Sequence, residues 1–562
     1  GQGVLVLVNG ERLAGETMDN VDFERLNLSD VERIEIVRGA ASALYGSNAA
    51  GGVINIITRQ QIHRPYELRW EMRNGRHDES RQNLFFATGQ GRITQLLTLS
   101  RTAADEYRLQ NPGDVTRHTK YSLNRVPGGR TFQARERFVV RPDDHWTLSG
   151  NVGYYFRQRD FDPGERNRYR DFAGGVKADW NGHNGRRAEV GYRFDQYDKS
   201  DYYVATGLDV RDYSNVQHTV RALYSTAPLP LWTEGHTLEL TGGGDLARDY
   251  LLTYQFRGDA HRQFTADGYV QADFHFGAQW EAVATARYDY FSVGHHGRPT
   301  TKLTARYRNG AWTLRASYGQ GFRAPTLKEK YMNFFLNDIF IIRGHEELRP
   351  EVSHNWHVSA DWSKGGTEVS SSVSYNRVLD RITTAEPTTE RDGLSGLPFV
   401  DYINVPRLTV WNVQLSVNHR RRLGSGTLSG TFQYAFTHEQ APTVGTLTPY
   451  MPARPHSATA RLAYDRRFSP QYAVGVQLSG RFLSALSGRE YNSATGASRT
   501  LHYPAYALLR LALTQQMGTA VRLNLTADNL LNYRPHIYYY NAPLTDGLNL
   551  SVGMTLDLDR LF

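Results

Sequence analysis

Apolar and polar residues alternate along much of this chain, which is the pattern of a β-strand with two different faces. In residues 312–319, WTLRASYG, the apolar residues would share one face and the polar residues and glycine the other. The same alternation occurs in residues 146–156 and 188–195. The dipeptide Asn309-Gly310, close before one of these segments, is a strong signal for a tight hairpin. The pattern predicts antiparallel strands joined by short turns.

A soluble β-sandwich also alternates, but the size and the aromatic content of the chain favour a membrane barrel. Aromatic residues make up 12% of the chain and crowd the ends of the predicted strands, as in the interfacial girdles of membrane barrels. The mean hydropathy is only −0.55, and no apolar run approaches the ~18 residues of a membrane helix. A barrel accommodates both facts because its strands alternate lipid-facing and lumen-facing residues. We therefore expect an all-β transmembrane barrel.

A different signal lies near the start of the chain, where two apolar runs flank a connection rich in Gly, Ala and Ser. The runs Val31–Val37 and Val53–Ile57 read as strands. Gly46 and Gly51 between them have the spacing of a phosphate-binding loop, but the following residues are Gly and Val instead of the Lys and Ser/Thr that bind phosphate and magnesium. We do not expect a nucleotide site.

This stretch closely resembles the end of the plug domain of TonB-dependent outer-membrane transporters. In that family a strand similar to VERIEVVRG precedes a turn ending in LYG and then the segment GGVINIIT. This chain carries VERIEIVRG at residues 31–39, LYG at 44–46 and GGVINIIT at 51–58.

Three later segments resemble the same family. Residues 321–331, GFRAPTLKEKY, are similar to its FRAP box, and residues 344–351, GHEELRPE, to a variant of its NPNL-x-PE box. Residues 527–533, ADNLLNY, are similar to a late-barrel motif, and an alternating strand runs towards the terminal Phe562. The resemblance therefore covers essentially the whole chain.

The resemblance implies a plugged barrel in the outer membrane of a Gram-negative bacterium. Residues 1–62 would form the C-terminal half of an α+β plug domain in the lumen, and residues 63–562 a barrel of about 22 antiparallel strands. The 500 residues from 63 to 562 allow roughly 23 per strand, enough for a ~10-residue crossing and one connection. The chain shows no signal peptide and begins in a segment that lies midway through the family's plug. We expect the first half of the plug, with the segment that binds TonB, to lie outside this sequence.

Three polar stretches interrupt the alternation and are predicted to be extracellular loops. They are Arg157–Tyr169, Thr383–Val405 and Thr437–Met451.

Candidate ligand-binding residues lie around the connection between the FRAP-like and NPNL-like boxes. In haem receptors a histidine of this connection can bind the iron, whereas residues 332–343 here contain none. His345 could offer a neutral imidazole to haem iron, or it could be a solvated loop residue like most of the 19 histidines in the chain. Four aromatic residues could stack against a porphyrin face. They are Tyr331, Phe334, Phe335 and Phe340.

The plug is expected to supply the floor of this site. Residues 12–23 correspond to an apical plug loop that rises towards the ligand in relatives, although they could also be an Asx-rich turn that holds two strands. Their polar side chains could form hydrogen bonds to a ligand, and a methionine could make a soft contact. These residues are Glu16, Thr17, Met18, Asp19 and Asn20.

Arg38 and Tyr45, in the glycine-rich stretch, are expected to have structural roles. Arg38 would pair with carboxylates and hold the plug in the polar lumen. A buried bidentate arginine of this kind would be a release point when the plug is pulled.

The net charge of +8 does not indicate a nucleic-acid partner, because Lys and Arg are spread among Asp and Glu in every segment. A solvated lumen and basic loops that face anionic lipopolysaccharide explain the charge. The absence of cysteine suits an oxidising envelope compartment.

The preferred hypothesis is an active importer of a scarce metal chelate, energised by TonB-ExbB-ExbD. Haem or another iron complex ranks first as the transported ligand and cobalamin second, with no intrinsic cofactor and with a surface lipoprotein as a further possible partner. A sensing or adhesion barrel without transport is the main alternative. An envelope enzyme is disfavoured, because no Ser and His spacing marks a catalytic dyad.

Overall fold

The computed structural model describes most of the chain, including nearly all of the predicted barrel. For a few strand residues it describes the backbone alone. The described residues are 4–13, 16–17, 20–27, 31–38, 47, 49, 52–59, 62, 64–109, 125–231, 235–256, 258, 260–336, 339–440, 453–492, 497–535, 543 and 545–561. Within these ranges, no helix combines the length and the apolar character needed to cross a membrane.

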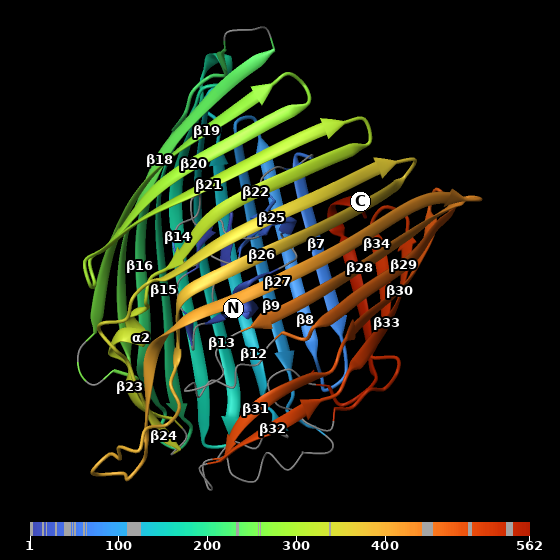
Figure 1. The fold of residues 1–562 in the computed structure, drawn as a ribbon. Coiled ribbons are helices and arrows are strands. Elements are labelled where there is room, and N and C mark those ends of the chain that lie inside the picture. The colour runs from blue at the N-terminus through green and yellow to red at the C-terminus, as the bar shows by residue number, and fades with distance from the viewer. Residues whose placement is uncertain are drawn as a thin grey trace.

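Twenty-two long strands of the described chain form one closed antiparallel barrel (Figure 1), as the sequence predicted. Neighbours in sequence pair with each other, and β35 pairs with β7 to close the ring. The strands are β7 (Tyr66–Asn74), β8 (Ser80–Gln90), β9 (Ile93–Ala104), β12 (Gly128–Val140), β13 (Trp146–Asp162), β14 (Glu165–Asn181), β15 (Arg187–Tyr203), β16 (Leu208–Ser225), β18 (His236–Thr253), β19 (His261–Phe276), β20 (Trp280–Phe291), β21 (His296–Asn309), β22 (Trp312–Arg323), β25 (Glu351–Lys364), β26 (Thr367–Thr384), β27 (Phe399–Leu423), β28 (Gly426–Gln440), β29 (His456–Ser469), β30 (Tyr472–Leu483), β33 (Tyr506–Met517), β34 (Val521–Asp528) and β35 (Asn549–Asp557).

Short strands and helices lie in the connections between the barrel strands. They are β10 (Tyr107–Arg108), β11 (Arg125–Val126), η4 (His183–Gly185), β17 (Leu229–Pro230), α2 (Leu327–Tyr331), β23 (Asn333–Leu336), β24 (Phe340–Arg343), β31 (Leu486–Asn492), β32 (Ala497–Tyr503) and η5 (Leu558–Arg560). The strands on either side of β17 and of β23–β24 still pair directly, β16 with β18 and β22 with β25, so these elements do not interrupt the wall.

The two ends of the barrel differ in the length of their connections. One end has tight turns such as residues 310–311, 365–366 and 424–425. The other end carries α2, β23, β24 and the β31–β32 hairpin, which lie in the lower half of Figure 1. We call these the short-turn end and the long-loop end.

The outer surface of the barrel is apolar, and the inner surface contacts the N-terminal domain. On β13, Trp146, Leu148, Val152 and Tyr154 are exposed on the outside, whereas Tyr155 is buried in the lumen. The alternation in the sequence therefore separates lipid-facing from lumen-facing positions.

The N-terminal residues fold into a small mixed sheet inside the barrel. Its strands are β1 (Val4–Val8), β2 (Glu11–Arg12), β5 (Val31–Arg38) and β6 (Gly52–Thr58), in the order β2-β1-β6-β5. β5 and β6 confirm the two strands predicted from the apolar runs. The remaining elements are the two-residue strands β3 (Glu16–Thr17) and β4 (Asn20–Val21) and the 3₁₀ helix η1 (Phe23–Arg25). Among the described residues of this domain, all helical residues belong to η1. Buried Leu5, Leu7 and Val53 form one side of its core.

The prediction of a loop at Arg157–Tyr169 is wrong. β13 continues to Asp162 and β14 begins at Glu165, so only Pro163 and Gly164 form the turn. Arg157 and Arg159 pair with Glu24 of the plug, whereas Arg166 and Arg168 pair with Asp160 and Asp209 on the outer face of the wall. The loop expected at Thr383–Val405 is confined to residues 385–398, because β26 and β27 extend into both of its ends. Of the third predicted loop, residues 437–440 belong to β28 and residues 441–451 lie outside the described ranges.

We predict that an arginine at the lipid-facing position 176 destabilises the barrel strongly. Val176 is 63% exposed near the middle of β14, where a charge would face hydrocarbon, so Val176→Arg should lower the free energy of unfolding by about 2–4 kcal/mol. Denaturant titration in lipid vesicles would measure this. Val176→Ala and Asn181→Arg, the latter at the short-turn end of the same strand, should each have a much smaller effect. Equal losses in all three variants would contradict a membrane-embedded outer face.

Candidate functional site

The 3₁₀ helix η1 fixes the plug to the barrel wall. It begins after Asp22, whose carboxylate accepts hydrogen bonds from the hydroxyls of Tyr155 (3.1 Å) and Tyr197 (2.9 Å) and from Arg157 (2.9 Å). Gln133 donates from its amide to the backbone oxygen of Arg25 at 2.7 Å. Strands β12, β13 and β15 therefore all hold the same short turn of the plug.

Arg25 completes this attachment with a buried ion-pair cluster. Its Nη2 lies 3.0 Å from Asp195 and 2.8 Å from Asp171, and the side chains of Arg25 and Asp195 are only 2% and 1% exposed. Burial alone would lower the pKa of Arg25, but the two aspartates more than offset burial and raise it above its usual value. The guanidinium is thus a permanent cation that two wall strands enclose.

A second site element is the connection between β22 and β25, residues 324–350. Its helix α2 begins with a capping box: Glu329 donates its backbone N–H to the Thr326 hydroxyl (3.2 Å) and accepts the Thr326 N–H on its carboxylate (2.8 Å). The same fully buried carboxylate accepts two hydrogen bonds of 2.9 Å from Arg323. The FRAP-like motif therefore encodes a capped helix that is tied back to the strand before it.

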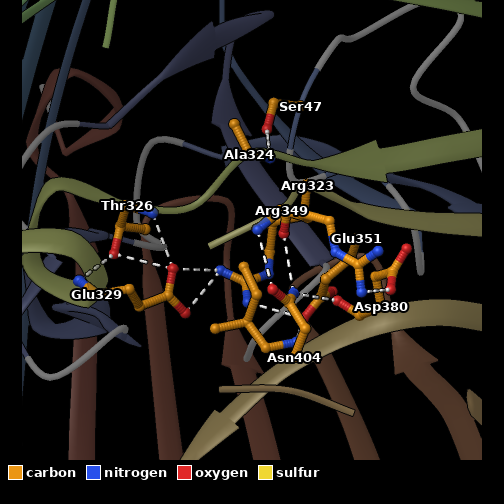
Figure 2. Close-up of polar contacts among 10 residues, drawn as sticks. Ser47, Arg323, Ala324, Thr326, Glu329, Arg349, Glu351, Asp380 and Asn404 are labelled. Carbon is orange, nitrogen blue, oxygen red and sulfur yellow. Dashed lines mark hydrogen bonds and ion pairs between the residues drawn. The ribbon is translucent and has the colours of Figure 1, made fainter. Parts of the chain in front are cut away.

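Figure 2 shows that the other end of this connection joins the same network. Arg323 also donates to Glu351 at 2.7 Å, at the start of β25. Arg349 pairs with Asp380 at 2.7 Å, and the amide of Asn404 donates to the backbone oxygens of both residues. Both ends of the connection are therefore fixed to β22, β25, β26 and β27.

The connection also touches the plug. The backbone N–H of Ala324 donates to the hydroxyl of Ser47 at 3.1 Å, and this contact is buried (Figure 2). A cavity next to it is lined by plug residues such as Leu5 and Arg12, by Leu327 of α2 and by inner residues of β16 to β20. The start of the connection thus lies between the long-loop end and the plug.

Aromatic side chains gather where α2 and β23 meet the connection between β18 and β19. The rings of His261 and Tyr331 stack at 3.8 Å with an angle of 5° between their planes, and Phe256 contacts His261 edge-on at 4.8 Å. Tyr254 meets Phe334 edge-on at 6.2 Å. Two predicted residues, Tyr331 and Phe334, therefore lie beside three aromatic partners from another part of the sequence.

Lysines lie around these aromatic rings. The ammonium of Lys199 is 5.4 Å from the ring centre of Tyr254, and that of Lys328 is 5.1 Å from the ring of Tyr213. Lys330 donates to the backbone oxygen of Glu346 at 2.9 Å, and burial lowers its pKa. Lys199 is also paired with Asp201 (3.2 Å) and Asp212 (2.9 Å), and Lys328 and Lys330 are buried. What this mouth offers a ligand is therefore aromatic stacking and not free positive charge.

The other predicted residues of this connection have different environments. His345 is exposed, and its backbone N–H donates to the backbone oxygen of Glu329 at 2.9 Å. Phe335 is 49% exposed, whereas Phe340 is 9% exposed beside the parallel pairing of β24 with β27. Phe340 is therefore placed to support the connection, and His345 and Phe335 are accessible.

The predicted plug residues fall largely outside the described part of the structure. The backbones of Glu16, Thr17 and Asn20 belong to the β3–β4 hairpin, but their side chains are not described, and Met18, Asp19 and Tyr45 lie outside the described ranges. Arg38 ends β5, and its side chain is likewise not described. Their proposed roles stay predictions.

Several residues of the site were missed by sequence reasoning. Arg25 is separated from Asp171 and Asp195 by about 150 residues or more, and nothing local marks the pairing. Tyr254 and Phe256 follow a strand end, where aromatic residues are also expected in the girdle of a membrane barrel, so nothing in the sequence singled them out. Among the described residues, no group of three or more His, Asp and Glu side chains could hold a metal ion.

The closed barrel, its apolar outer wall and the enclosed plug define a class of protein, the plugged outer-membrane barrels. The family description "TonB dependent receptor-like, beta-barrel" matches residues 69–530, and "TonB-dependent Receptor Plug Domain" matches residues 1–53. The chain belongs to the TonB-dependent receptor family and is an outer-membrane protein. The short-turn end is accordingly periplasmic and the long-loop end extracellular.

Curated relatives include transporters and an iron-regulated protein. A vitamin B12 transporter BtuB of Photobacterium profundum is 25% identical over 65% of this chain, and one of Vibrio cholerae is 28% identical over 74%. An iron-regulated outer membrane virulence protein of Vibrio cholerae is 25% identical over 67% of the chain. The matched regions span 58%, 66% and 59% of the lengths of these three relatives, respectively.

Solved structures share the fold at low sequence identity. The ferric enterobactin receptor PfeA of Pseudomonas aeruginosa has a TM-score of 0.78 at 16% identity, over 99% of this chain and 90% of that one. The FrpB iron transporter of Neisseria meningitidis has a TM-score of 0.77 at 12% identity, over 99% and 91%. This likeness supports the plugged-barrel fold.

We predict that removing the charge of Arg25 loosens the plug. Arg25→Met would leave buried Asp171 without its cation and Asp195 with Arg193 alone, so the free energy of local opening of the plug should fall by about 3–5 kcal/mol. Hydrogen exchange of the β1 and β6 backbone amides would measure this. Arg33→Met is a matched control, because its ion pairs with Glu32 and Glu35 are exposed and should be worth about 0–1 kcal/mol. Similar exchange in the two variants would refute the docking role of η1.

We also predict that Glu329 maintains the folded connection. Glu329→Ala removes the capping box and one partner of Arg323, so α2 should open more readily by about 2–4 kcal/mol. Hydrogen exchange at the Lys330 and Met332 amides, which close this helix, reports the change. Glu347→Ala, at an exposed position in the same connection, should leave exchange unaltered. An unchanged α2 in the first variant would show that the network does not support the helix.

Proposed function

We propose that the protein is an active importer of a scarce metal chelate. The chelate binds at the extracellular mouth, and TonB, energised with ExbB and ExbD, pulls on the plug to open a path to the periplasm. No bond in the chelate has to break, so the proposal contains no enzymatic step and no intrinsic cofactor. A receptor without transport remains the competing hypothesis, and a surface lipoprotein could be a further partner.

One observation carries this proposal. The connection at residues 324–350 presents Tyr331 and Phe334 to the extracellular mouth and, through Ala324, contacts Ser47 of the plug. A ligand on the mouth and the movable plug therefore share one folded segment. An adhesion barrel would need no such connection between its outer surface and a domain that closes its lumen.

For the ligand, we propose an iron complex first and cobalamin second. Aromatic rings at the mouth suit a flat or aromatic chelate, such as haem or a ferric catecholate. His345 is accessible and could bind haem iron, and the predicted plug residues could contact the ligand from below. Cobalamin is the second candidate, because the B12 transporters named above are 25–28% identical to this chain.

Binding and uptake measurements test the proposal. The purified protein should be titrated with haem by Soret spectroscopy and with a ferric catecholate and cobalamin by calorimetry. We predict that an iron complex binds and that Tyr331→Ala weakens it about three- to tenfold. Tyr472→Ala, which removes an aromatic residue at the periplasmic end, should have no effect. His345→Ala should change the Soret band if this residue binds haem iron.

Three results would contradict parts of this proposal. Absence of a haem titration would remove haem, and binding of cobalamin alone would reverse the ranking of ligands. Uptake of labelled ligand that persists in cells without TonB would refute active import and favour the competing hypothesis.

A further inference from the structure

Among the residues that the structure describes, Lys302 is a lumen-facing cation without a counter-charge. It lies on β21 next to Leu303, which is 56% exposed on the outer wall, so the alternation of the strand turns Lys302 inward. Its ammonium has no ion pair or hydrogen bond with any described residue. Three lumen-facing arginines of β20 to β22, by contrast, each pair with a carboxylate: Arg287 with Asp267, Arg306 with Glu281 and Arg323 with Glu329. A half-buried, unpaired charge costs stability, so a structural role does not account for Lys302.

Strand register places two amides across a bare stretch of wall from Lys302. Lys302 lies opposite Gly319 of β22, Gly319 opposite Asn355 of β25, and Asn355 opposite Asn376 of β26. The backbones of β21 and β25 are two strand spacings or about 10 Å apart, and Gly319 places no side chain between them. Glycine inside a strand often marks a point where a ligand or another chain approaches the backbone closely. The lysine and the amides therefore border a place where a group in the lumen can meet the wall.

Two buried hydroxyls lie beside these residues. Thr300 and Ser353, two residues from Lys302 and Asn355 on the same faces of their strands, are each 1% exposed. Within the described part of the chain, both hydroxyl oxygens and the amide oxygen of Asn376 are buried without a hydrogen bond. Burial of unsatisfied polar atoms costs free energy, and here three of them gather beside an unpaired cation. We call this group the Lys302 site, which consists of Thr300, Lys302, Ser353, Asn355 and Asn376 around Gly319 and Gly321.

The Lys302 site lies next to the point where the extracellular connection meets the plug. Ala324, whose backbone N–H donates to Ser47 of the plug at 3.1 Å, directly follows β22. Gly321 and Gly319 precede it on the same strand, towards the periplasm. A chelate group that leaves the mouth along β22 therefore reaches Lys302 after it has passed the contact with the plug.

We propose that the Lys302 site binds a carboxylate group of the imported chelate after the chelate has left the mouth. This inference rests on the proposed import function and specifies the chelate further. The ammonium of Lys302 donates to carboxylate oxygens, and the hydroxyls of Thr300 and Ser353 are further donors. The acceptor on Asn376 suits a hydroxyl next to the carboxylate, as in an α-hydroxycarboxylate. Haem, with its propionates, and ferric hydroxycarboxylates carry carboxylates, whereas the side chains of the cobalamin ring end in neutral amides.

Lys302→Met tests the site, because it removes the charge and nearly keeps the length of the side chain. Lys302→Arg keeps the charge, and Thr300→Val/Ser353→Ala removes the hydroxyls and keeps the lysine. The matched control is Lys364→Met, at an exposed position at the periplasmic end of β25. Uptake of labelled haem, haem dimethyl ester, ferric citrate and cobalamin is measured in cells that produce each protein. Binding of the same complexes and denaturant unfolding are measured on the purified proteins.

We expect Lys302→Met to slow uptake of the carboxylate complex that the wild-type protein imports, haem or ferric citrate, at least about tenfold. The double variant should slow it about threefold, whereas Lys302→Arg and Lys364→Met should import at nearly the wild-type rate. Binding at the mouth should be the same in all variants. Entry of haem dimethyl ester and cobalamin, which offer no carboxylate, should not depend on Lys302. Lys302→Met should be at least as stable as the wild type, because it removes an unpaired charge.

Wild-type uptake in Lys302→Met, or an equal loss in Lys364→Met, would overturn the inference. Lower stability of Lys302→Met would show a structural role, and an equal loss for haem dimethyl ester would exclude recognition of a carboxylate; either result would also overturn it. If the wild-type protein imports cobalamin but neither carboxylate complex, this inference fails while active import stands. If no complex enters in a TonB-dependent way, the proposed import function fails with it.

Discussion

Closure of the sheet between β7 and β35 is the constraint on which the rest of this structure depends. Hydrocarbon offers no hydrogen bonds, so every strand in the membrane must be paired on both sides, and only a closed ring achieves this. Twenty-two strands make the ring wide enough to hold a folded domain. A ring this wide leaves a lumen that must be filled. The plug fills it, and the plug's polar contacts and the connection at residues 324–350 hold the plug in place.

The described contacts of η1 with the wall are made by charged, amide and hydroxyl groups instead of by an apolar interface. Asp22 and Arg25 are buried against wall residues that are themselves charged or hydroxylated. Buried ion pairs contribute little net stability relative to apolar packing, but they are costly to break singly. Such contacts suit a domain that must stay docked at rest and yet sit in a lumen that water can enter when the plug moves.

The extracellular connection combines two tasks through one set of buried charges. Arg323, Glu329 and Glu351 fold it into the mouth, so that aromatic rings face outward while Ala324 reaches the plug. Next to them, Lys302 faces the lumen without a counter-charge among the described residues. The wall beside the plug therefore contains two kinds of charge, paired ones that hold the fold and an unpaired one that does not.

Alternation and local motifs in the sequence determined the barrel and the plug strands β5 and β6, because period-two patterns depend only on near neighbours. The capping box of α2 is also local, although the sequence analysis did not predict that helix. Composition misled the prediction at residues 157–169, since charges on a barrel strand look the same whether they face solvent, lumen or lipid headgroups. Only the tertiary structure decided that Arg25 meets Asp171 and Asp195, that Tyr331 stacks on His261, and that Lys302 lies opposite Gly319. The physical reason is register: which distant side chains meet is set by how the strands pair around the ring, and a shift of one residue would turn each of them to the other side of the wall.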